Sequence, residues 1–139
     1  MTGRILTRNP TDDELIEQAK LVQGEAYAPY SNFKVGAAIL SDDGRIFLGC
    51  NVENASYGAT ICAERNAVAN GVSTGARRFK KLAIVTDQDD PVMPCGICRQ
   101  VLFEFSPDLV IISVGKSGKR KQVKLKDLLP FGFRLENPK

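Results

Sequence analysis

The chain contains no histidine among its 139 residues, and this absence removes several kinds of catalytic site at once. Ser-His-Asp and Cys-His catalysis both need an imidazole as the general base. His-Glu-x-x-His zinc peptidases, and any other zinc site with histidine ligands, are excluded as well. Any chemistry must therefore be carried out by cysteine, aspartate, glutamate, lysine, arginine or tyrosine side chains.

Long apolar runs and N-terminal targeting patterns are also missing. No apolar run approaches the ~18 residues that a membrane-spanning helix needs. The sequence does not open with a basic stretch followed by an apolar segment, which is the pattern of a secretory signal. We therefore expect a cytoplasmic protein that has no membrane partner.

The charge balance is too mild to indicate a nucleic-acid-binding face. The net charge is +3, and 25% of the residues are charged. The basic excess lies partly in residues 116–126, which we interpret as a solvated hairpin. The sequence also lacks the aromatic platform on which single-stranded nucleic acid stacks, so we expect no nucleic-acid partner.

The hydrophobic pattern indicates one domain, spanning residues 1–139, with a frayed start at 1–10. Thr11 and Glu14 form a capping-box pattern that predicts a helix start. No internal repeat or linker interrupts the rest. Apolar periodicity and turn residues predict helices near 12–27, 62–72, 96–105 and 125–129, and strands at 33–40, 45–50, 82–86, 109–114 and 119–123.

The order of these elements predicts the fold class. The order is helix, two strands, helix, strand, helix, strand and strand. This order favours a sheet covered by helices on both faces, with a hairpin at one edge. We therefore expect an α/β fold, a three-layer α/β/α sandwich around a mixed five-stranded sheet.

Three of the four cysteines fall in two short motifs, Cys62-Ala63-Glu64 and Pro94-Cys95-Gly96-Ile97-Cys98. In reducing cytosol, such cysteines favour metal binding or catalysis over disulfides. The fourth, Cys50, closes the apolar stretch 46–50, and we interpret it as a buried structural thiol.

The spacing of the motif cysteines predicts a zinc site. Cys95 and Cys98 can both reach one Zn²⁺, and Cys62 supplies a third thiolate, which leaves the fourth tetrahedral position for water. Cys62 and Cys95 both fall at expected helix starts, where the helix dipole stabilises thiolates. Because three thiolates give the site a formal charge of −1, Arg65 and Arg99 are candidates to donate hydrogen bonds to the sulfurs.

Glu64 follows Cys62 by two residues, close enough to face that water without binding the metal. A carboxylate there can take a proton from the water and deliver it to a substrate nitrogen and to departing ammonia, which is hydrolytic deamination. Two alternatives are a structural zinc site, which normally has four protein ligands, and a redox Cys-x-x-Cys pair, which leaves Cys62 and Glu64 unexplained.

These motifs resemble the cytidine deaminases, specifically the small homotetrameric, zinc-dependent type with three cysteine ligands. The resemblance covers roughly residues 12–133. It is carried by segments 27–31, 33–38, 49–57, 62–65, 94–100 and 128–130, followed by Phe133.

The resemblance implies a function and a set of site residues. It implies deamination of cytidine and 2′-deoxycytidine to uridine and 2′-deoxyuridine plus ammonia, in pyrimidine salvage, with one Zn²⁺ per chain. A homotetramer with shared active sites is implied as well. The implied roles are Glu64 as the catalytic residue, Cys62, Cys95 and Cys98 as metal ligands, Arg65 against the thiolates, and Phe33, Asn51, Glu53, Tyr57, Ala63 and Phe133 as substrate-binding residues.

Within that set, Asn51 and Glu53 would bind the ribose 3′-hydroxyl, because one can donate and both can accept hydrogen bonds. Phe33 would pack on the pyrimidine, and the Ala63 backbone would bind the base. Tyr57 and Phe133 would reach the site of a neighbouring subunit.

Other interpretations stay open at this point. Phe33 could belong to the core, Asn51 and Glu53 to a solvated loop, and Tyr57 to local packing. Phe133 could lie in a frayed tail, and Phe131 beside it leaves open which ring reaches the neighbour. A deaminase of the antibiotic blasticidin S shares the motifs, and a zinc-stabilised binding module is the alternative from another class.

Overall fold

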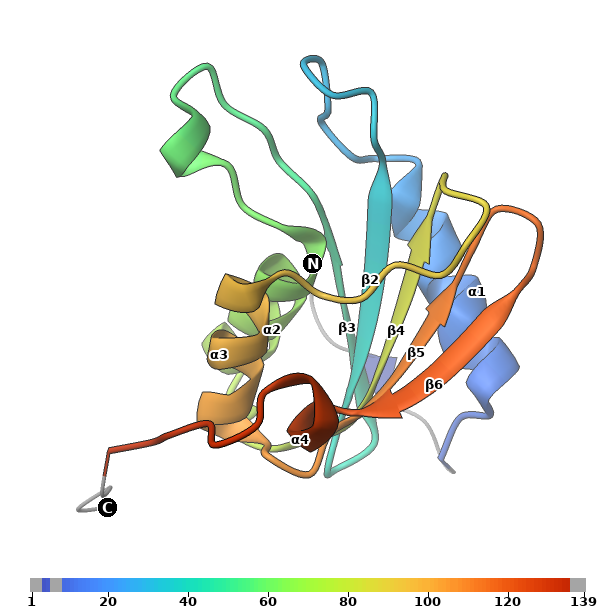
Figure 1. Ribbon diagram of the computed structural model, residues 1–139. Coiled ribbons are helices and arrows are strands. Elements are labelled where there is room, and N and C mark those ends of the chain that lie inside the picture. The colour runs from blue at the N-terminus through green and yellow to red at the C-terminus, as the bar shows by residue number, and fades with distance from the viewer. Residues whose placement is uncertain (1–3, 6–8, 136–139) are drawn as a thin grey trace.

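The computed structural model describes residues 4–5 and 9–135, and these form a mixed sheet between layers of helices (Figure 1). Within the described residues the sheet has six strands in the order β1-β3-β2-β4-β5-β6. The helices are α1 (Asp12–Gln23), α2 (Ala63–Ser73), α3 (Gly96–Phe105) and α4 (Leu125–Leu128), with a 3₁₀ turn at Tyr57–Ala59, and the strands are β1 (Arg4–Ile5), β2 (Val35–Ser41), β3 (Arg45–Cys50), β4 (Phe79–Thr86), β5 (Val110–Val114) and β6 (Arg120–Lys124). None of the helices described is long and apolar enough to span a bilayer.

The first helix begins where the capping pattern predicts. The Thr11 hydroxyl accepts the Glu14 N–H at 3.1 Å, and the Glu14 carboxylate accepts the Thr11 N–H at 2.8 Å. The helix ends at Gln23, however, and does not continue to residue 27. The reason is tertiary, because the Tyr27 N–H donates to the Asn51 carbonyl at 3.0 Å and so commits the chain to a bridge beside the sheet.

The five expected strands are all present. Strands β2 and β3 form a hairpin, β2 pairs antiparallel with β4, β4 pairs parallel with β5 across α3, and β5 and β6 form a second hairpin. The additional strand β1 pairs with the outer side of β3. The prediction of a frayed start is therefore wrong at Arg4–Ile5, where two residues are too few to show a periodicity. Residues 1–3 and 6–8 lie outside the described part.

Helices cover both faces of the sheet, which confirms the three-layer α/β/α architecture (Figure 1). Because neighbouring strand residues face opposite ways, β2 contributes to two cores. Ala38 and Leu40 pack with the α1 residues, whereas Ala37 and Ile39 pack on the side of α2 and α3. Helices α2 and α3 thus lie on the same face.

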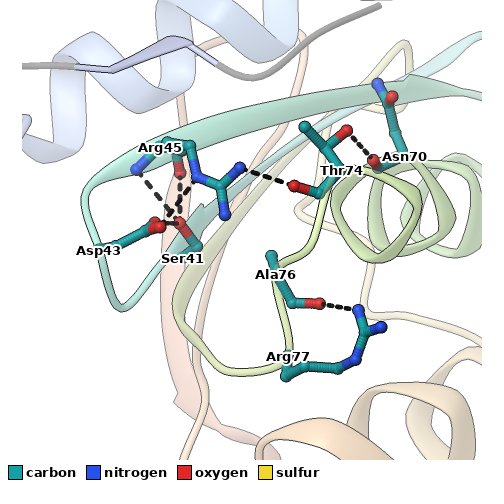
Figure 2. Close-up of polar contacts among 7 residues, drawn as sticks. All are labelled: Ser41, Asp43, Arg45, Asn70, Thr74, Ala76 and Arg77. Atoms are coloured by element: carbon teal, nitrogen blue, oxygen red, sulfur yellow. Dashed lines mark hydrogen bonds and ion pairs between the residues drawn. The ribbon is translucent and has the colours of Figure 1, made fainter.

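A polar cluster fixes the C-terminal end of α2 to the turn between β2 and β3 (Figure 2). Arg45 donates to the Thr74 carbonyl at 2.9 Å and to the Asp43 carboxylate at 2.9 Å. Hydrogen bonds from Ser41 and Arg45 lower the pKa of Asp43 to about 2. This cluster secures one end of α2, and the motif Cys62-Ala63-Glu64 lies at the other end.

Close contact between β3 and α2 requires a glycine at position 49. A Cβ atom there would lie 2.3 Å from the Ala67 nitrogen and 2.4 Å from the Ala63 carbonyl oxygen. Both are backbone atoms of α2, so the helix itself would have to move.

Gly49→Ala should lower the free energy of unfolding by ~1–3 kcal/mol, because a methyl group is forced into a packed contact. Urea unfolding followed by circular dichroism measures this change. Gly58→Ala is the matched control, since a Cβ atom there meets nothing within 4 Å, and its stability should change by less than ~0.5 kcal/mol. Equal effects of the two substitutions would contradict the close-packing argument.

Candidate metal centre and catalytic pocket

The three motif cysteines converge at the beginnings of two helices. Cys62 and Cys95 are the N-cap residues of α2 and α3, and Cys98 lies one turn into α3 and is buried. Their sulfurs all lie within 4.8 Å of one another, and the Cys62 and Cys95 sulfurs are 3.7 Å apart. Across residues 4–5 and 9–135, no aspartate, glutamate or further cysteine joins this group.

This sulfur group fits a zinc ion. Zn–S bonds of ~2.3 Å in a tetrahedral arrangement place two thiolate sulfurs about 3.8 Å apart, close to the separation of Cys62 and Cys95. Soft thiolate ligands also suit zinc. Three protein ligands leave one tetrahedral position free for a non-protein ligand, which is the pattern of catalytic rather than structural zinc sites. Cys50, the fourth cysteine of the chain, lies outside the group and so does not complete a structural site, and it is half-buried rather than buried as expected.

The electrostatics of the group already favour a thiolate at Cys62. A hydrogen bond from the Cys98 thiol lowers the pKa of Cys62 to about 5, and burial opposes this effect only in part. The same hydrogen bond raises the pKa of Cys98. Arg65 adds to the stabilisation of the Cys62 thiolate, with its Nη2 atom 3.7 Å from the sulfur.

The two arginines beside the motifs behave differently. Arg65 contacts Cys62 as expected and also donates to the Thr60 carbonyl at 3.2 Å, while its buried Nε has no hydrogen-bond partner in the described structure. The expectation that Arg99 donates to the sulfurs is wrong. Its side chain instead donates to the carbonyls of Pro94 and Leu128. Adjacent helical residues project about 100° apart, so Arg99 points away from the direction of Cys98.

A cavity of about 310 Å³ opens beside the sulfurs. This volume is in the range of ~300–1,000 Å³ that is typical of small-molecule sites. Its lining includes seven residues singled out from the sequence, namely Phe33, Asn51, Glu53, Cys62, Ala63, Glu64 and Cys95. Segments that are distant in the sequence are therefore brought together around one space.

Glu64 is the buried acid of this cavity. It is the second residue of α2 and its side chain lies beside the sulfur group, with 6% of the residue exposed. The pKa of Glu64 is raised to about 7, chiefly by burial and also by the neighbouring Cys62 thiolate, while a backbone N–H and Arg65 act in the opposite direction. A carboxyl group that titrates near neutrality is suited to both accepting and donating a proton.

Asn51 is held rigidly in the cavity wall. Its Oδ1 accepts the Val35 N–H at 2.9 Å, and its Nδ2 donates to the Phe33 carbonyl at 2.7 Å. With 7% of the residue exposed, Asn51 is not part of a solvated loop. Phe33 itself lines the cavity and also packs against the core, so the two interpretations of its role are compatible.

Glu53 is also fixed by hydrogen bonds. One carboxylate oxygen accepts the N–H groups of Tyr30 at 2.9 Å and Ser31 at 3.1 Å, and the other accepts the Ser31 hydroxyl. These bonds, that of the Ser31 hydroxyl above all, lower the pKa of Glu53. The carboxylate is thus held charged at the edge of the cavity.

Tyr57 and Phe133 do not line the cavity. Tyr57 is 77% exposed, and its ring lies edge-on to Tyr30 with centroids 6.2 Å apart. Phe133 is 65% exposed, and Gln100 donates to its carbonyl at 3.3 Å. Phe131 is fully exposed. Their contribution to a neighbouring site stays a prediction.

Part of the cavity wall was not anticipated from the sequence. The additional lining residues are Ser31, Val35, Thr60, Ile84, Thr86, Val92 and Met93. The backbone of Val92 is fixed by the fully buried Ser113, whose hydroxyl donates to the Val92 carbonyl at 2.7 Å. Two features of the sequence could have indicated these residues. Val92 and Met93 directly precede the second cysteine motif, and Ile84 and Thr86 lie at the end of an expected strand, where α/β folds bind ligands.

Comparison with known proteins identifies the family. Residues 9–114 match the model of the cytidine and deoxycytidylate deaminase zinc-binding region. The chain is 44% identical to a cytidine deaminase of Sporosarcina psychrophila over 90% of this chain and 93% of the other, and 49% identical to one of Mycobacterium tuberculosis over 81% of each. The crystal structure of cytidine deaminase from Burkholderia pseudomallei superposes with a TM-score of 0.86 at 46% identity, covering 89% of this chain and 100% of that one. These matches confirm the resemblance inferred from the motifs, and the chain belongs to the cytidine and deoxycytidylate deaminase family.

Proposed function

We propose that this chain is a single catalytic domain that deaminates cytidine and 2′-deoxycytidine hydrolytically, in the pyrimidine salvage of the cytoplasm. Each turnover consumes one water and releases uridine or 2′-deoxyuridine and one ammonia. The observation that carries this proposal is the burial of Glu64 in the cavity that Cys62 and Cys95, two of the three converging cysteines, also line. The free thiols that the site needs are kept reduced in cytoplasm, which supports the assigned compartment.

One zinc ion per chain would be held by Cys62, Cys95 and Cys98, and when bound it supplies an acidified water molecule. Glu64 takes a proton from the attacking water as the new C–O bond forms at C4 of the pyrimidine, and passes it to the ring nitrogen. Glu64 then takes the remaining proton from the new C4 hydroxyl and delivers it to the exocyclic amine. The bond between C4 and the exocyclic nitrogen breaks, ammonia departs, and C4 is left as a carbonyl.

Arg65 balances the charge of this centre. Three thiolates around a divalent cation carry a net charge of −1, which weakens the cation's effect on the acidity of water. The guanidinium 3.7 Å from the Cys62 sulfur withdraws part of that charge by hydrogen bonding.

The cavity wall supplies the groups that hold the nucleoside. Phe33 packs on the pyrimidine ring, and the Ala63 N–H at the start of α2 donates to the base. Asn51 and Glu53 bind the ribose 3′-hydroxyl. Because both side chains are already pinned by the protein, their remaining lone pairs and N–H are oriented in advance, and little entropy is lost on binding.

The active unit is a homotetramer in which neighbours complete each other's sites. Tyr57 is exposed beside the ring of Tyr30, and Tyr27, Val52 and Ile61, which backbone bridges bring together, are exposed large side chains as well. Contiguous apolar exposure of this kind marks protein–protein contacts. Phe133 projects from the C-terminal segment and is the ring that reaches the neighbouring cavity.

Purified, metal-analysed protein should convert cytidine to uridine with about one zinc per chain, and removal of the metal by a chelator should abolish turnover. The fall in ultraviolet absorbance on deamination measures the rate, and added zinc should restore it. Zinc-loaded protein without turnover of cytidine would refute the nucleoside assignment, and blasticidin S would then be the substrate to test. A zinc-loaded protein inactive on both would indicate a structural zinc site.

Glu64→Gln and Glu64→Ala should retain zinc but lose turnover by about 10²–10⁴-fold, because a general acid–base is removed while the ligands remain. Zinc content by metal analysis and the initial deamination rate separate the two properties. If either variant kept more than a tenth of the rate, Glu64 would not be the catalytic residue.

Phe133→Ala should raise the KM for cytidine several-fold, since an aromatic contact contributes ~0.5–1.5 kcal/mol beyond its buried area. Phe131→Ala is the control and should leave KM unchanged. Light scattering should give the mass of four chains for both. An active monomer at nanomolar concentration would show that no neighbour contributes to the site.

A further inference from the structure

Arg99 holds two backbone carbonyls that belong to different parts of the site. Its Nε donates to the Pro94 carbonyl at 2.7 Å, and its Nη1 donates to the Leu128 carbonyl at 3.0 Å. A cation within the first turns of a helix is disfavoured by the helix dipole. The presence of an arginine here is thus explained by its tertiary contacts and not by a helical preference.

The first contact bears on the metal ligand Cys95. The peptide unit that joins Pro94 to Cys95 is planar, so fixing its oxygen also fixes the nitrogen and Cα of Cys95. Cys95 needs such support because it is exposed, and its side chain makes no capping hydrogen bond to α3. Cys98, by contrast, is buried within the helix packing.

The second contact bears on the C-terminal segment, residues 128–135. Leu128 is the last residue of α4, and the segment continues to Phe133, whose carbonyl accepts a hydrogen bond from Gln100 at 3.3 Å. A Cβ atom built on Gly132 would lie 3.0 Å from the Phe103 ring, so the segment packs closely on α3. Two successive residues of α3 therefore hold this segment, and the first of them also holds the loop of the metal site.

We propose that Arg99 is a positioning residue that orients Cys95 for zinc and links the metal-binding loop to the segment that carries Phe133. Where the link concerns substrate, this inference rests on the proposed function. Loss of Arg99 frees the Pro94–Cys95 peptide, so zinc leaves faster. It also releases the C-terminal segment, so the substrate binds less tightly.

The first experiment measures zinc release to a colorimetric chelator from zinc-loaded wild type, Arg99→Met, Arg99→Lys and Arg77→Met. Arg77 is a matched control, because its Nη1 also donates to two carbonyls, those of Val72 and Ala76, both at 2.9 Å, but at the far end of α2 (Figure 2). Release from Arg99→Met should be ~10–100-fold faster than from wild type, the range that support groups behind metal ligands typically contribute. Arg77→Met should match wild type, and Arg99→Lys should lie between, because one ammonium cannot span both carbonyls.

The melting temperatures of the zinc-free proteins separate positioning from general stability. Equal zinc-free melting temperatures for Arg99→Met and Arg77→Met, together with faster release from Arg99→Met alone, support the proposal. Wild-type release from both Arg99 variants, or equal acceleration by Arg77→Met, overturns it. If Arg99→Met does not fold, Arg99→Lys carries the same comparison. None of these measurements uses cytidine, so a failure of the proposed function is seen separately.

The link to the C-terminal segment is tested by combining Arg99→Lys with Phe133→Ala at saturating zinc. If Arg99 acts on KM by holding the segment, the double variant should raise KM by less than the product of the two single effects. If the increase in KM of the double variant equals the product of the two single increases, this half of the proposal is overturned.

Discussion

The site depends on two helices whose N-termini meet on one face of the sheet. Each helix start offers N–H groups that have no partner within the helix, and the two together create a place where negative charge is stabilised. Cys62 and Cys95 occupy these two places as N-cap residues, so their sulfurs converge there, and the pKa of Cys62 is lowered to about 5, chiefly by a hydrogen bond from the Cys98 thiol. The glycine contact between β3 and α2, and the polar cluster at the far end of α2, matter because they fix the direction of that helix.

Arg65 and Arg99 support this negative centre in different ways. Arg65 lies against a sulfur and balances its charge directly, while Arg99 has its guanidinium satisfied by carbonyl oxygens and acts on geometry. Their sequence positions, each next to a motif, look equivalent. Their angular positions on the two helices differ, however. As a result Arg65 contacts the charged sulfur, and Arg99 contacts backbone carbonyls.

Much of this could be predicted from the sequence, for reasons that are local. The capping pair Thr11 and Glu14 needs only a spacing of three residues, and the strand 45–50 is an apolar stretch that directly follows a turn, so both were placed correctly. The three cysteines were found because a C-x-x-C pair and a third thiol are chemically recognisable. The predictions that were wrong or missing concern features set by residues distant in the chain. Asn51 determines where α1 ends, β3 determines the strand β1, and α4 determines the direction of Arg99.

The lining of the cavity fits the proposal that a second chain completes the side of the site assigned to the ribose. Glu64 and the apolar side chains of Ile84, Val92 and Met93 are part of the cavity lining. Three other lining residues, Ser31, Glu53 and Thr60, also line a second hollow of about 380 Å³ that Tyr57 borders. A pinned carboxylate facing such an open space attracts a hydroxyl but does not exclude water, and water competes for the same hydrogen bonds. In the proposed tetramer, an aromatic ring from a second copy that covers this hollow would remove the competing water, so we expect the affinity for the ribose to depend on assembly more than the affinity for the base.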